Sequence, residues 1–242
     1  MKVAVLGPSP PIYSGSLEAI WIPIIKIEPR RGSSITVVEL LSSRYRAVVF
    51  TSPRGPMVLA MDAIMHGVFG RLKRLLDEAL IAVVGPRTGE AVRRFFMVEW
   101  DIMPSVYTGS SLAVELVNRG VDNVVLARSS RGIRDLPETL ARRGVNYAEA
   151  VVYDEMLDQS GIDRVASLVK LGAVNAVLLT SPFIAEAFCS SIGKYTGDVR
   201  LYAIGPSTAR SIRDKCGIQA RYPDNYTYSS ALSLIEYDLK MR

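Results

Sequence analysis

Short apolar runs alternate with amphipathic segments along the whole chain. The predicted strands are residues 2–6, 22–28, 47–51, 80–84, 123–127, 148–153, 175–180 and 200–204. The predicted helices are residues 54–65, 88–95, 109–118, 134–142, 161–171, 183–192, 207–215 and 228–239. The run 47–51 is almost unbroken, which is typical of a strand covered on both faces. The regular alternation predicts an α/β protein with parallel sheets flanked by helices.

Three motifs occur twice, in the same order, in the two halves of the chain. AVVFTSP at 47–53 returns as AVLLTSP at 176–182, and VVGPRT at 83–88 returns as AIGPST at 203–208. The pattern P-x-x-Y-T occurs at 104–108 and again at 223–227. The ordered repetition predicts two similar domains built on one α/β unit. Each motif lies where a strand gives way to a helix, which is where open α/β sheets bind ligands. Two such edges facing each other would form a cleft.

The first unit is incomplete, which indicates a discontinuous domain. After the strand at 2–6 the sequence offers only a short helix candidate near 16–20 before the next strand. We therefore expect residues 1–29 and 154–242 to form one α/β domain, with residues 30–153 inserted as the other. The chain would cross between them near 22–30 and 146–156, in extended conformation.

The repeated turns carry residues that suit helix N-termini. Ser52-Pro53 and Ser181-Pro182 combine an N-cap serine with a proline at the first helical position. Thr108 and Thr227 are also predicted N-caps. Thr88 and Thr208 are predicted to lie in the first turns of their helices. Helix N-termini favour carboxylates and phosphates, so each turn is a candidate anion site. The plainer interpretation is that these residues only cap helices.

Several classes of function are disfavoured. The chain has no G-x-G-x-x-G, P-loop or G-x-S-x-G motif, and the single histidine, His66, is expected to be a packing or surface residue. Cys189 and Cys216 are expected to be reduced, with Cys189 in the core, and no zinc site is expected. No apolar run approaches the roughly 18 residues of a membrane span. The net charge of +5 comes from scattered basic residues, which fits a polyanionic small molecule better than nucleic acid.

The same segments resemble the uroporphyrinogen-III synthase family over nearly the whole chain. The resemblance covers PIIKIEP at 23–29, the repeated motifs, VVLARSSR at 124–131, LPETL at 136–140 and VVY at 151–153. One departure lies after the first strand, where the family usually has Arg-Pro and a longer helix. Here the turn reads Leu6-Gly7-Pro8-Ser9, and the helix is cut short.

The resemblance implies both an architecture and an activity. It implies two domains joined by a two-stranded extended linker, with the active-site cleft between them. The activity is cyclisation of hydroxymethylbilane to uroporphyrinogen III, with inversion of the last pyrrole ring and loss of water, in haem, sirohaem or cobalamin biosynthesis. It implies no metal or organic cofactor, a cytoplasmic enzyme without nucleic-acid or membrane partners, and a transient contact with the preceding bilane-forming enzyme.

Matching the family motifs assigns roles to individual residues. Tyr153, expected at the end of the second crossing strand, would assist loss of the substrate hydroxyl. The expected substrate-binding residues are Ser52, Thr88, Tyr107, Thr108, Arg128, Arg131, Ser181, Thr208, Tyr226 and Thr227. The two arginines would pair with carboxylates in bidentate fashion. Plainer alternatives remain, namely a half-buried tyrosine that packs the linker and solvated surface arginines.

Two other functions stay open at this point. A non-catalytic two-domain module that closes on an anionic metabolite would use the same edges, and turnover of the bilane separates it from an enzyme. A phosphosugar or nucleotide-sugar transferase would need a nucleotide site, and no such motif is present.

Overall fold

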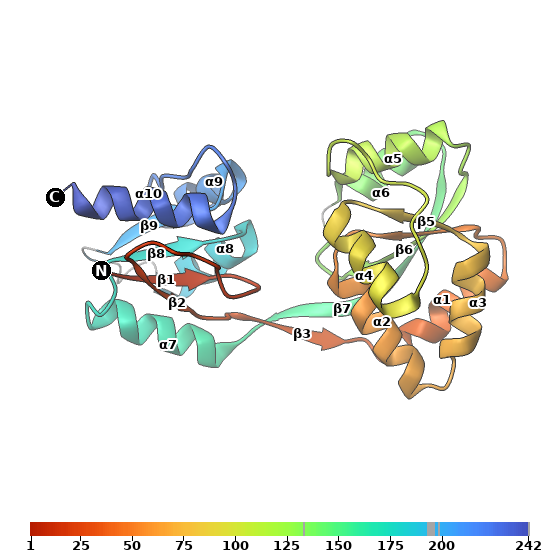
Figure 1. Cartoon of the computed structure of the whole chain (residues 1–242), viewed down its shortest axis with the longest axis horizontal. Helices are drawn as coiled ribbons and strands as arrows, with labels where there is room; N and C mark the ends of the chain where they lie inside the picture. Colours follow the sequence, from red (N-terminus) through yellow and green to blue (C-terminus); the bar gives the residue numbers. More distant parts are fainter. Residues whose placement is uncertain (133, 193–196, 198, 242) are drawn as a thin grey trace. The chain divides into compact units, whose positions relative to one another are not determined.

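The protein consists of two compact units, in a computed structural model that describes residues 1–132, 134–192, 197 and 199–241. Unit 1 comprises Met1–Lys26 and Met156–Arg242, and unit 2 comprises Ile27–Glu155 (Figure 1). The chain leaves unit 1 in β3 (Ile25–Pro29) and returns at the end of β7 (Asn146–Leu157). The boundaries predicted from the sequence lay between residues 29 and 30 and between residues 153 and 154, each within three residues of the ones seen here. That each unit folds by itself stays a prediction.

Unit 2 is built on a five-stranded sheet in the order β3-β7-β6-β4-β5. Its remaining strands are β4 (Ala47–Phe50), β5 (Leu80–Val83) and β6 (Asn123–Ser129). The pairs β4–β5, β4–β6 and β6–β7 are parallel. Every residue of β4 is buried, as expected for a central strand covered on both faces. The predicted class, α/β with parallel sheets flanked by helices, is confirmed.

Two helical layers cover this sheet. One layer consists of α1 (Ser33–Ser42), α2 (Arg54–Met65), α3 (Phe69–Glu78) and α4 (Pro86–Phe96). The opposite layer consists of α5 (Gly109–Asn118) and α6 (Asp135–Arg142). Alternate residues of β4 serve the two layers: Val48 and Phe50 pack with the first, Val49 with the second. This alternation is the pleat of a strand buried on both sides.

Unit 1 repeats the plan with four strands in the order β2-β1-β8-β9. They are β1 (Lys2–Leu6), β2 (Glu18–Trp21), β8 (Ala176–Leu179) and β9 (Arg200–Ala203), and all neighbouring pairs are parallel. One face packs on α7 (Gln159–Lys170), α8 (Pro182–Ile192) and α9 (Pro206–Cys216). The other packs on α10 (Tyr228–Lys240).

The two sheets correspond strand by strand. The order β7-β6-β4-β5 of unit 2 matches β2-β1-β8-β9 of unit 1. Both units also place an isolated parallel bridge beyond the last strand, Ala82 to Ile102 in one and Tyr202 to Arg221 in the other. Unit 1 takes the strands β2 and β1 from the start of the chain, which explains why the repeat looked truncated there.

Two local predictions are wrong, and tertiary pairing explains both. Residues 16–20 are not helical: β2 begins at Glu18 and adds to β1 as a short edge strand. The predicted strand 22–28 begins only at Ile25, because Ile22 and Ile24 turn into the core of unit 1 around Pro23.

The sequence analysis did not predict two helices, α1 and α3. The first is rich in β-branched residues, which lower helix propensity.

A loop replaces the helix that would join β1 to β2. Glu236 of α10 holds this loop, accepting hydrogen bonds from the Tyr13 hydroxyl and from the hydroxyl and backbone N–H of Ser16. The contact with Lys240, together with the hydrogen bonds from Ser16 and Tyr13, lowers the pKa of Glu236 to about 2. The carboxylate is therefore ionised, and its charge strengthens these bonds.

The prediction that Cys189 and Cys216 are reduced is also wrong, whereas Cys189 does lie in the core of unit 1 as predicted. Cys189 in α8 and Cys216 at the end of α9 form a disulfide across 27 residues of sequence. The two helices pack together within unit 1 through Ile184, Phe188 and Ile212. Their packing brings the sulfur atoms together, a proximity that cysteine spacing along the chain does not reveal.

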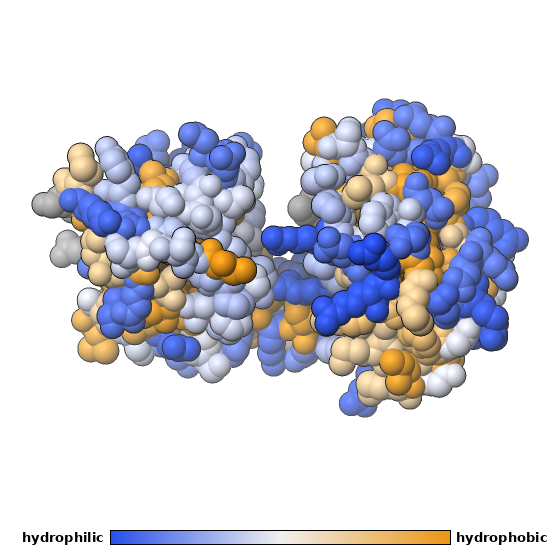
Figure 2. Space-filling model, viewed as in Figure 1, coloured by the Kyte–Doolittle hydropathy of each residue, from blue (hydrophilic) through white to orange (hydrophobic). Residues whose placement is uncertain are grey.

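The viewed face of the surface carries both hydrophilic and apolar residues. Figure 2 shows hydrophilic residues over much of it, with apolar residues between them. Exposed apolar side chains of unit 2 include Met61, Ile64 and Met65 of α2. Among the described helices, none has the length and apolar character needed to cross a bilayer.

Candidate functional site

The predicted site residues cluster at one edge of each sheet. Ser52 follows β4, and Thr88 lies in the first turn of α4 directly after β5. Ser181 and Thr208 hold the same places after β8 and β9. The four strands of unit 1 are parallel, and so are β4 to β7 of unit 2. The carboxyl ends of these strands therefore meet at one edge of each sheet, where α/β proteins bind ligands. Each unit therefore presents its own rim of hydroxyl groups.

The rim of unit 2 contains a pair of hydrogen-bonded hydroxyls. The Tyr153 hydroxyl lies 2.7 Å from the Ser52 hydroxyl, and either oxygen can be the donor. Tyr153 does not end its strand as predicted, since β7 continues to Leu157. Its ring is buried in the unit 2 core, which fixes the side chain. The pair therefore joins a core residue of β7 to the turn after β4.

The surroundings keep the Tyr153 phenol protonated. Burial raises its pKa above the ordinary value of 10.0, and the charge of Glu155 adds to the rise. The hydrogen bond with Ser52 and the charge of Arg54 act in the opposite direction without cancelling it. Arg54 and Glu155 face each other at 3.7 Å. Tyr153 is therefore a neutral O–H donor around neutral pH, with an ion pair close by.

Ser52 does not act as the predicted helix cap. The N-cap of α2 is Pro53, whose ring contains no hydrogen-bond acceptor. The Ser52 hydroxyl is hydrogen-bonded to the Tyr153 hydroxyl instead. Its counterpart Ser181 does cap a helix, because its hydroxyl accepts the N–H of Ile184 at 3.2 Å. The two serines of the repeated motif thus have different partners.

The four rim threonines behave as matched pairs. Thr108 and Thr227 are N-caps, and each hydroxyl accepts the N–H three residues later at 3.2 Å. Thr88 and Thr208 are almost fully buried in the first turns of α4 and α9. The capping predictions are confirmed for Thr108 and Thr227. All four side chains lie at the start of a helix that begins at the rim.

The rim tyrosines sit over the glycines of the Gly-Pro turns. Tyr107 and Tyr226 are both about 60% exposed. A Cβ added to Gly85 would lie 3.4 Å from Tyr107, and one added to Gly205 would lie 3.2 Å from Tyr226. Each glycine therefore lets a tyrosine ring lie close against the turn, while the rest of the ring stays open to solvent.

The two predicted arginines differ in their surroundings. Arg128, at the end of β6, is almost fully buried, and its Nε lies 3.9 Å from Glu149. Arg131 is exposed, and its Nε donates to the backbone oxygen of Glu155 at 3.3 Å. Of the two, Arg131 is the one that a ligand carboxylate can reach without a change of structure.

The turn after β1 explains the departure at Gly7. A side chain there would meet the Tyr228 hydroxyl, because an added Cβ would lie only 2.2 Å from it, and Thr180 at 2.9 Å. The strand registers make Gly7 the counterpart of Arg128, since Leu6 pairs with Leu179 as Ala127 pairs with Phe50. In unit 1 a tyrosine from α10 therefore fills space beside the strand end, where unit 2 has an arginine.

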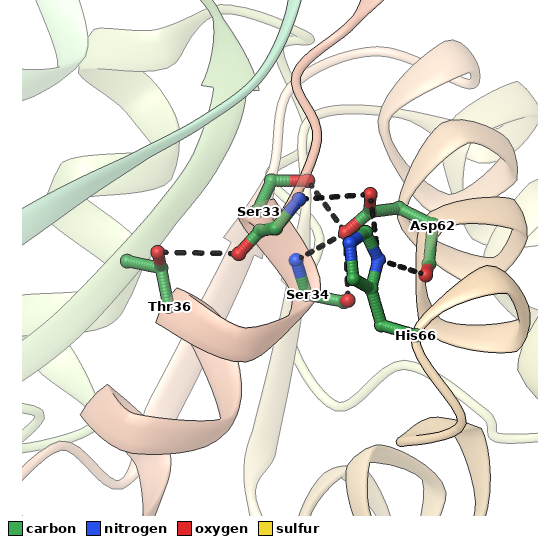
Figure 3. Close-up of polar contacts among 6 residues, drawn as sticks. Ser33, Ser34, Thr36, Asp62 and His66 are labelled. Atoms are coloured by element: carbon green, nitrogen blue, oxygen red, sulfur yellow. Dashed lines mark hydrogen bonds and ion pairs between the residues drawn. The ribbon is translucent and has the colours of Figure 1, made fainter.

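The sequence analysis did not predict a buried carboxylate that lies in unit 2. Asp62 of α2 accepts the backbone N–H groups of Gly32 and Ser34 and the Ser34 hydroxyl (Figure 3). Burial by itself would raise its pKa. The bonds from Ser34 and Gly32 and the nearby His66 outweigh burial and lower it. Asp62 thus caps α1 from another helix, and the Asp62-x-x-x-His66 spacing was the only local hint.

His66 belongs to this capping cluster. Its Nδ1 lies 2.9 Å from the backbone oxygen and 3.2 Å from the carboxylate of Asp62. This agrees with the expectation of a packing or surface role. Within the described residues, no three His, Cys, Asp or Glu side chains are arranged to hold a metal ion.

Comparison with known proteins identifies the family to which the sequence is similar. Residues 12–233 match the family model described as "Uroporphyrinogen-III synthase HemD". A protein of Methanocaldococcus jannaschii named "Putative uroporphyrinogen-III synthase" is 26% identical over 201 residues, covering 79% of this chain and 78% of its own.

Solved structures show the same fold at low identity. The uroporphyrinogen-III synthetase of Helicobacter pylori superposes with a TM-score of 0.71 at 16% identity, covering 100% of both chains. A mutant uroporphyrinogen III synthase of Thermus thermophilus gives a TM-score of 0.64 at 16% identity, with 100% of this chain and 99% of that chain covered.

Proposed function

The chain belongs to the uroporphyrinogen-III synthase family, the hydro-lyases that convert hydroxymethylbilane to uroporphyrinogen III in tetrapyrrole biosynthesis, and we propose that Tyr153 and Ser52 carry its chemistry. The supporting observation is the hydrogen bond between their hydroxyls at 2.7 Å, on a rim otherwise made of helix starts. Tyr153 is the catalytic residue of this proposal, and Ser52 positions it.

Tyr153 acts as the general acid. The carbon–oxygen bond of the substrate hydroxymethyl group breaks, and its electron pair stays on the departing oxygen, which leaves as water with the phenol proton. The carbon then bonds to the last pyrrole ring at the position that already carries a bridge, and that older bridge bond breaks. The released bridge carbon bonds to the free α-position of the same ring, which inverts the ring, and the proton lost from that position balances the one supplied. The phenolate formed in between is stabilised by the Ser52 hydroxyl and the charge of Arg54, both of which favour ionised Tyr153.

The other rim residues bind the substrate. A bilane carries many carboxylates, and oriented hydroxyls and helix N-termini suit such groups. Tyr107, Tyr226 and Arg131 are exposed and make direct contact with carboxylates, whereas Thr88 and Thr208 act at the helix starts. Thr108, Thr227 and Ser181 contribute mainly by holding helix N-termini in place. Arg128 supports the strand end from within the fold.

The reaction is a proton-coupled dehydration and cyclisation, for which positioned hydroxyl groups supply the chemistry without an organic cofactor or a metal. We place the protein in the cytoplasm, with hydroxymethylbilane received from the preceding bilane-forming enzyme through a transient contact. The alternative of a non-catalytic binding module predicts binding of the bilane without turnover.

An isomer assay tests the proposal. Purified protein is supplied with hydroxymethylbilane in the presence of EDTA, the product is oxidised, and type I and type III porphyrins are resolved. The native protein should give the type III isomer, whereas spontaneous closure gives type I.

Tyr153→Phe should slow type III formation strongly. Tyr202→Phe is the matched control, because Tyr202 is also buried and hydrogen-bonded, to Asp238. Equal loss in both variants would make the Tyr153 effect structural.

A further inference from the structure

A cavity lies in unit 2, away from the hydroxyl pair. It has a volume of about 650 Å³ and is lined by Ser110, Ser111, Val114, Thr139, Arg142 and Arg143. Its walls are α5 and α6, which lie side by side in Figure 1, with Arg143 directly after α6. This volume is within the range of small-molecule sites, roughly 300–1,000 Å³.

The sheet of unit 2 separates this cavity from Tyr153. The helices α5 and α6 pack on one sheet face through residues such as Leu112 and Leu136. Tyr153 belongs to the core on the opposite face, under α1 to α4. A ligand between α5 and α6 therefore does not contact the hydroxyl pair.

The cavity is lined mainly by side chains that can donate hydrogen bonds. Five of the six side chains carry hydroxyl or guanidinium groups, the sixth is Val114, and none is acidic. Arg142 is held in place, because its Nη2 donates to the Thr139 hydroxyl at 3.2 Å and its Nε to the Glu138 backbone oxygen at 3.3 Å. The Arg143 guanidinium has no hydrogen bond or ion pair within the part of the chain that the structure describes.

Side chains rather than backbone amides would recognise a ligand here. The Ser110 N–H donates to Asp135, and the Ser111 N–H donates to Thr108, so the start of α5 is already capped. The hydroxyls remain: the Thr108 hydroxyl donates to that of Ser111 at 2.9 Å and lies 3.2 Å from that of Ser110. The Asp135 carboxylate is engaged by the N–H groups of Ser110 and Leu136.

We propose that this groove between α5 and α6 binds the oxyanion group of a small molecule, a carboxylate or a phosphate, independently of the Ser52–Tyr153 pair. The planar guanidinium of Arg143 presents paired N–H donors that match such oxygens, and Arg142, already oriented by Thr139, supplies a second charge. The Ser110 and Ser111 hydroxyls complete the set of donors, and Val114 provides an apolar contact for the rest of the ligand.

Nuclear magnetic resonance titration of the full chain tests the site. Inorganic phosphate, citrate and a porphyrin octacarboxylate are added separately at constant ionic strength. A bound oxyanion should shift the amide signals of residues 110–114 and 139–143 in a saturable way. The double variant Arg142→Gln/Arg143→Gln should weaken that binding at least tenfold. The matched control is Arg93→Gln/Arg94→Gln, which removes two neighbouring arginines from the last turn of α4, outside the cavity.

The outcomes distinguish the site from a general charge effect. Saturation by phosphate alone assigns the groove to phosphorylated ligands, and saturation by citrate or the porphyrin assigns it to carboxylates. Absence of saturable shifts at these residues with all three probes overturns the proposal. So does equal weakening by the control pair, because binding would then follow net charge. The isomer assay is independent of this titration, so failure of one does not decide the other.

Discussion

The Tyr153 hydroxyl lies 2.7 Å from the Ser52 hydroxyl, which joins the buried interior of β7 to the turn after β4. The corresponding strand of unit 1, β2, leads into Ile22, Pro23 and Ile24, which carry no hydroxyl. Ser181, the counterpart of Ser52, caps α8 instead. Each unit has a rim of the same kind, but among the described residues a tyrosine hydroxyl is hydrogen-bonded to the repeated serine in unit 2 and not in unit 1.

Removing the phenol oxygen should lower turnover more than binding. Tyr153→Phe keeps the packed ring and deletes the proton donor, so kcat should fall by about 10²–10⁴-fold while KM changes little. Because the pKa of Tyr153 is raised, its ionisation should not reduce kcat below about pH 10. Steady-state kinetics across pH, with type III product as the readout, check both points. Near-normal kcat in Tyr153→Phe would place the acid elsewhere.

Removing the buried rim threonines should have a smaller effect. Thr88→Val and Thr208→Val keep the side-chain shape and delete one hydroxyl each, at a cost of about 0.5–1.5 kcal/mol. That corresponds to a loss in kcat/KM of roughly 2- to 13-fold. Both are almost fully buried at equivalent helix starts, so the two variants serve as controls for each other. A loss larger than that of Tyr153→Phe would contradict the assigned ranking.

Removing the Asp62 carboxylate should destabilise unit 2. Asp62→Ala leaves the N–H groups of Gly32 and Ser34 without their acceptor, at a cost of about 1.5–3 kcal/mol. The folded-state pKa is lowered, so this stabilisation is present above the unfolded pKa of about 3.9 and is lost as pH falls through the folded value. Urea unfolding at pH 7 and pH 3 measures it. Asp77→Asn, at an exposed carboxylate, should cost no more than about 0.5 kcal/mol.

Reducing the disulfide should destabilise unit 1. The bond joins two residues that are 27 positions apart in the sequence, and bonds of this kind typically contribute about 2–4 kcal/mol. Urea unfolding of the native protein should therefore shift to lower urea when dithiothreitol is present. The double variant Cys189→Ala/Cys216→Ala should be equally destabilised and insensitive to dithiothreitol. Identical native curves with and without the reductant would show that the bond contributes nothing.

Unit 2 should fold without unit 1. A fragment of residues 27–155 retains the five-stranded unit and both helical layers, so it should show a cooperative thermal transition. The shorter fragment 33–150 lacks β3 and also Val152 and Tyr153, which are buried in the core, and it should be less stable. Circular dichroism melts of both compare them directly. A non-cooperative melt of fragment 27–155 would mean that unit 2 depends on the rest of the chain.

Local pattern was sufficient for the repeat, the α/β class and most element positions. The helix at 109–118 was placed to the residue, because Thr108 supplies an N-cap and the apolar spacing is regular. The rim residues could also be located, because the carboxyl ends of parallel strands always meet at one edge. The family followed from the order of the same motifs.

Tertiary structure decided the features that depend on distant partners. Residues 18–21 are a strand because β1 offers an edge to pair with, although the local sequence was compatible with a helix. The sulfurs of Cys189 and Cys216, the oxygens of Ser52 and Tyr153, and the cap that Asp62 provides to α1 all join residues far apart in the chain. Spacing along a sequence specifies only local geometry. Which turn faces which strand is set by the packing of whole layers against a sheet, and that packing appears only when the chain is folded.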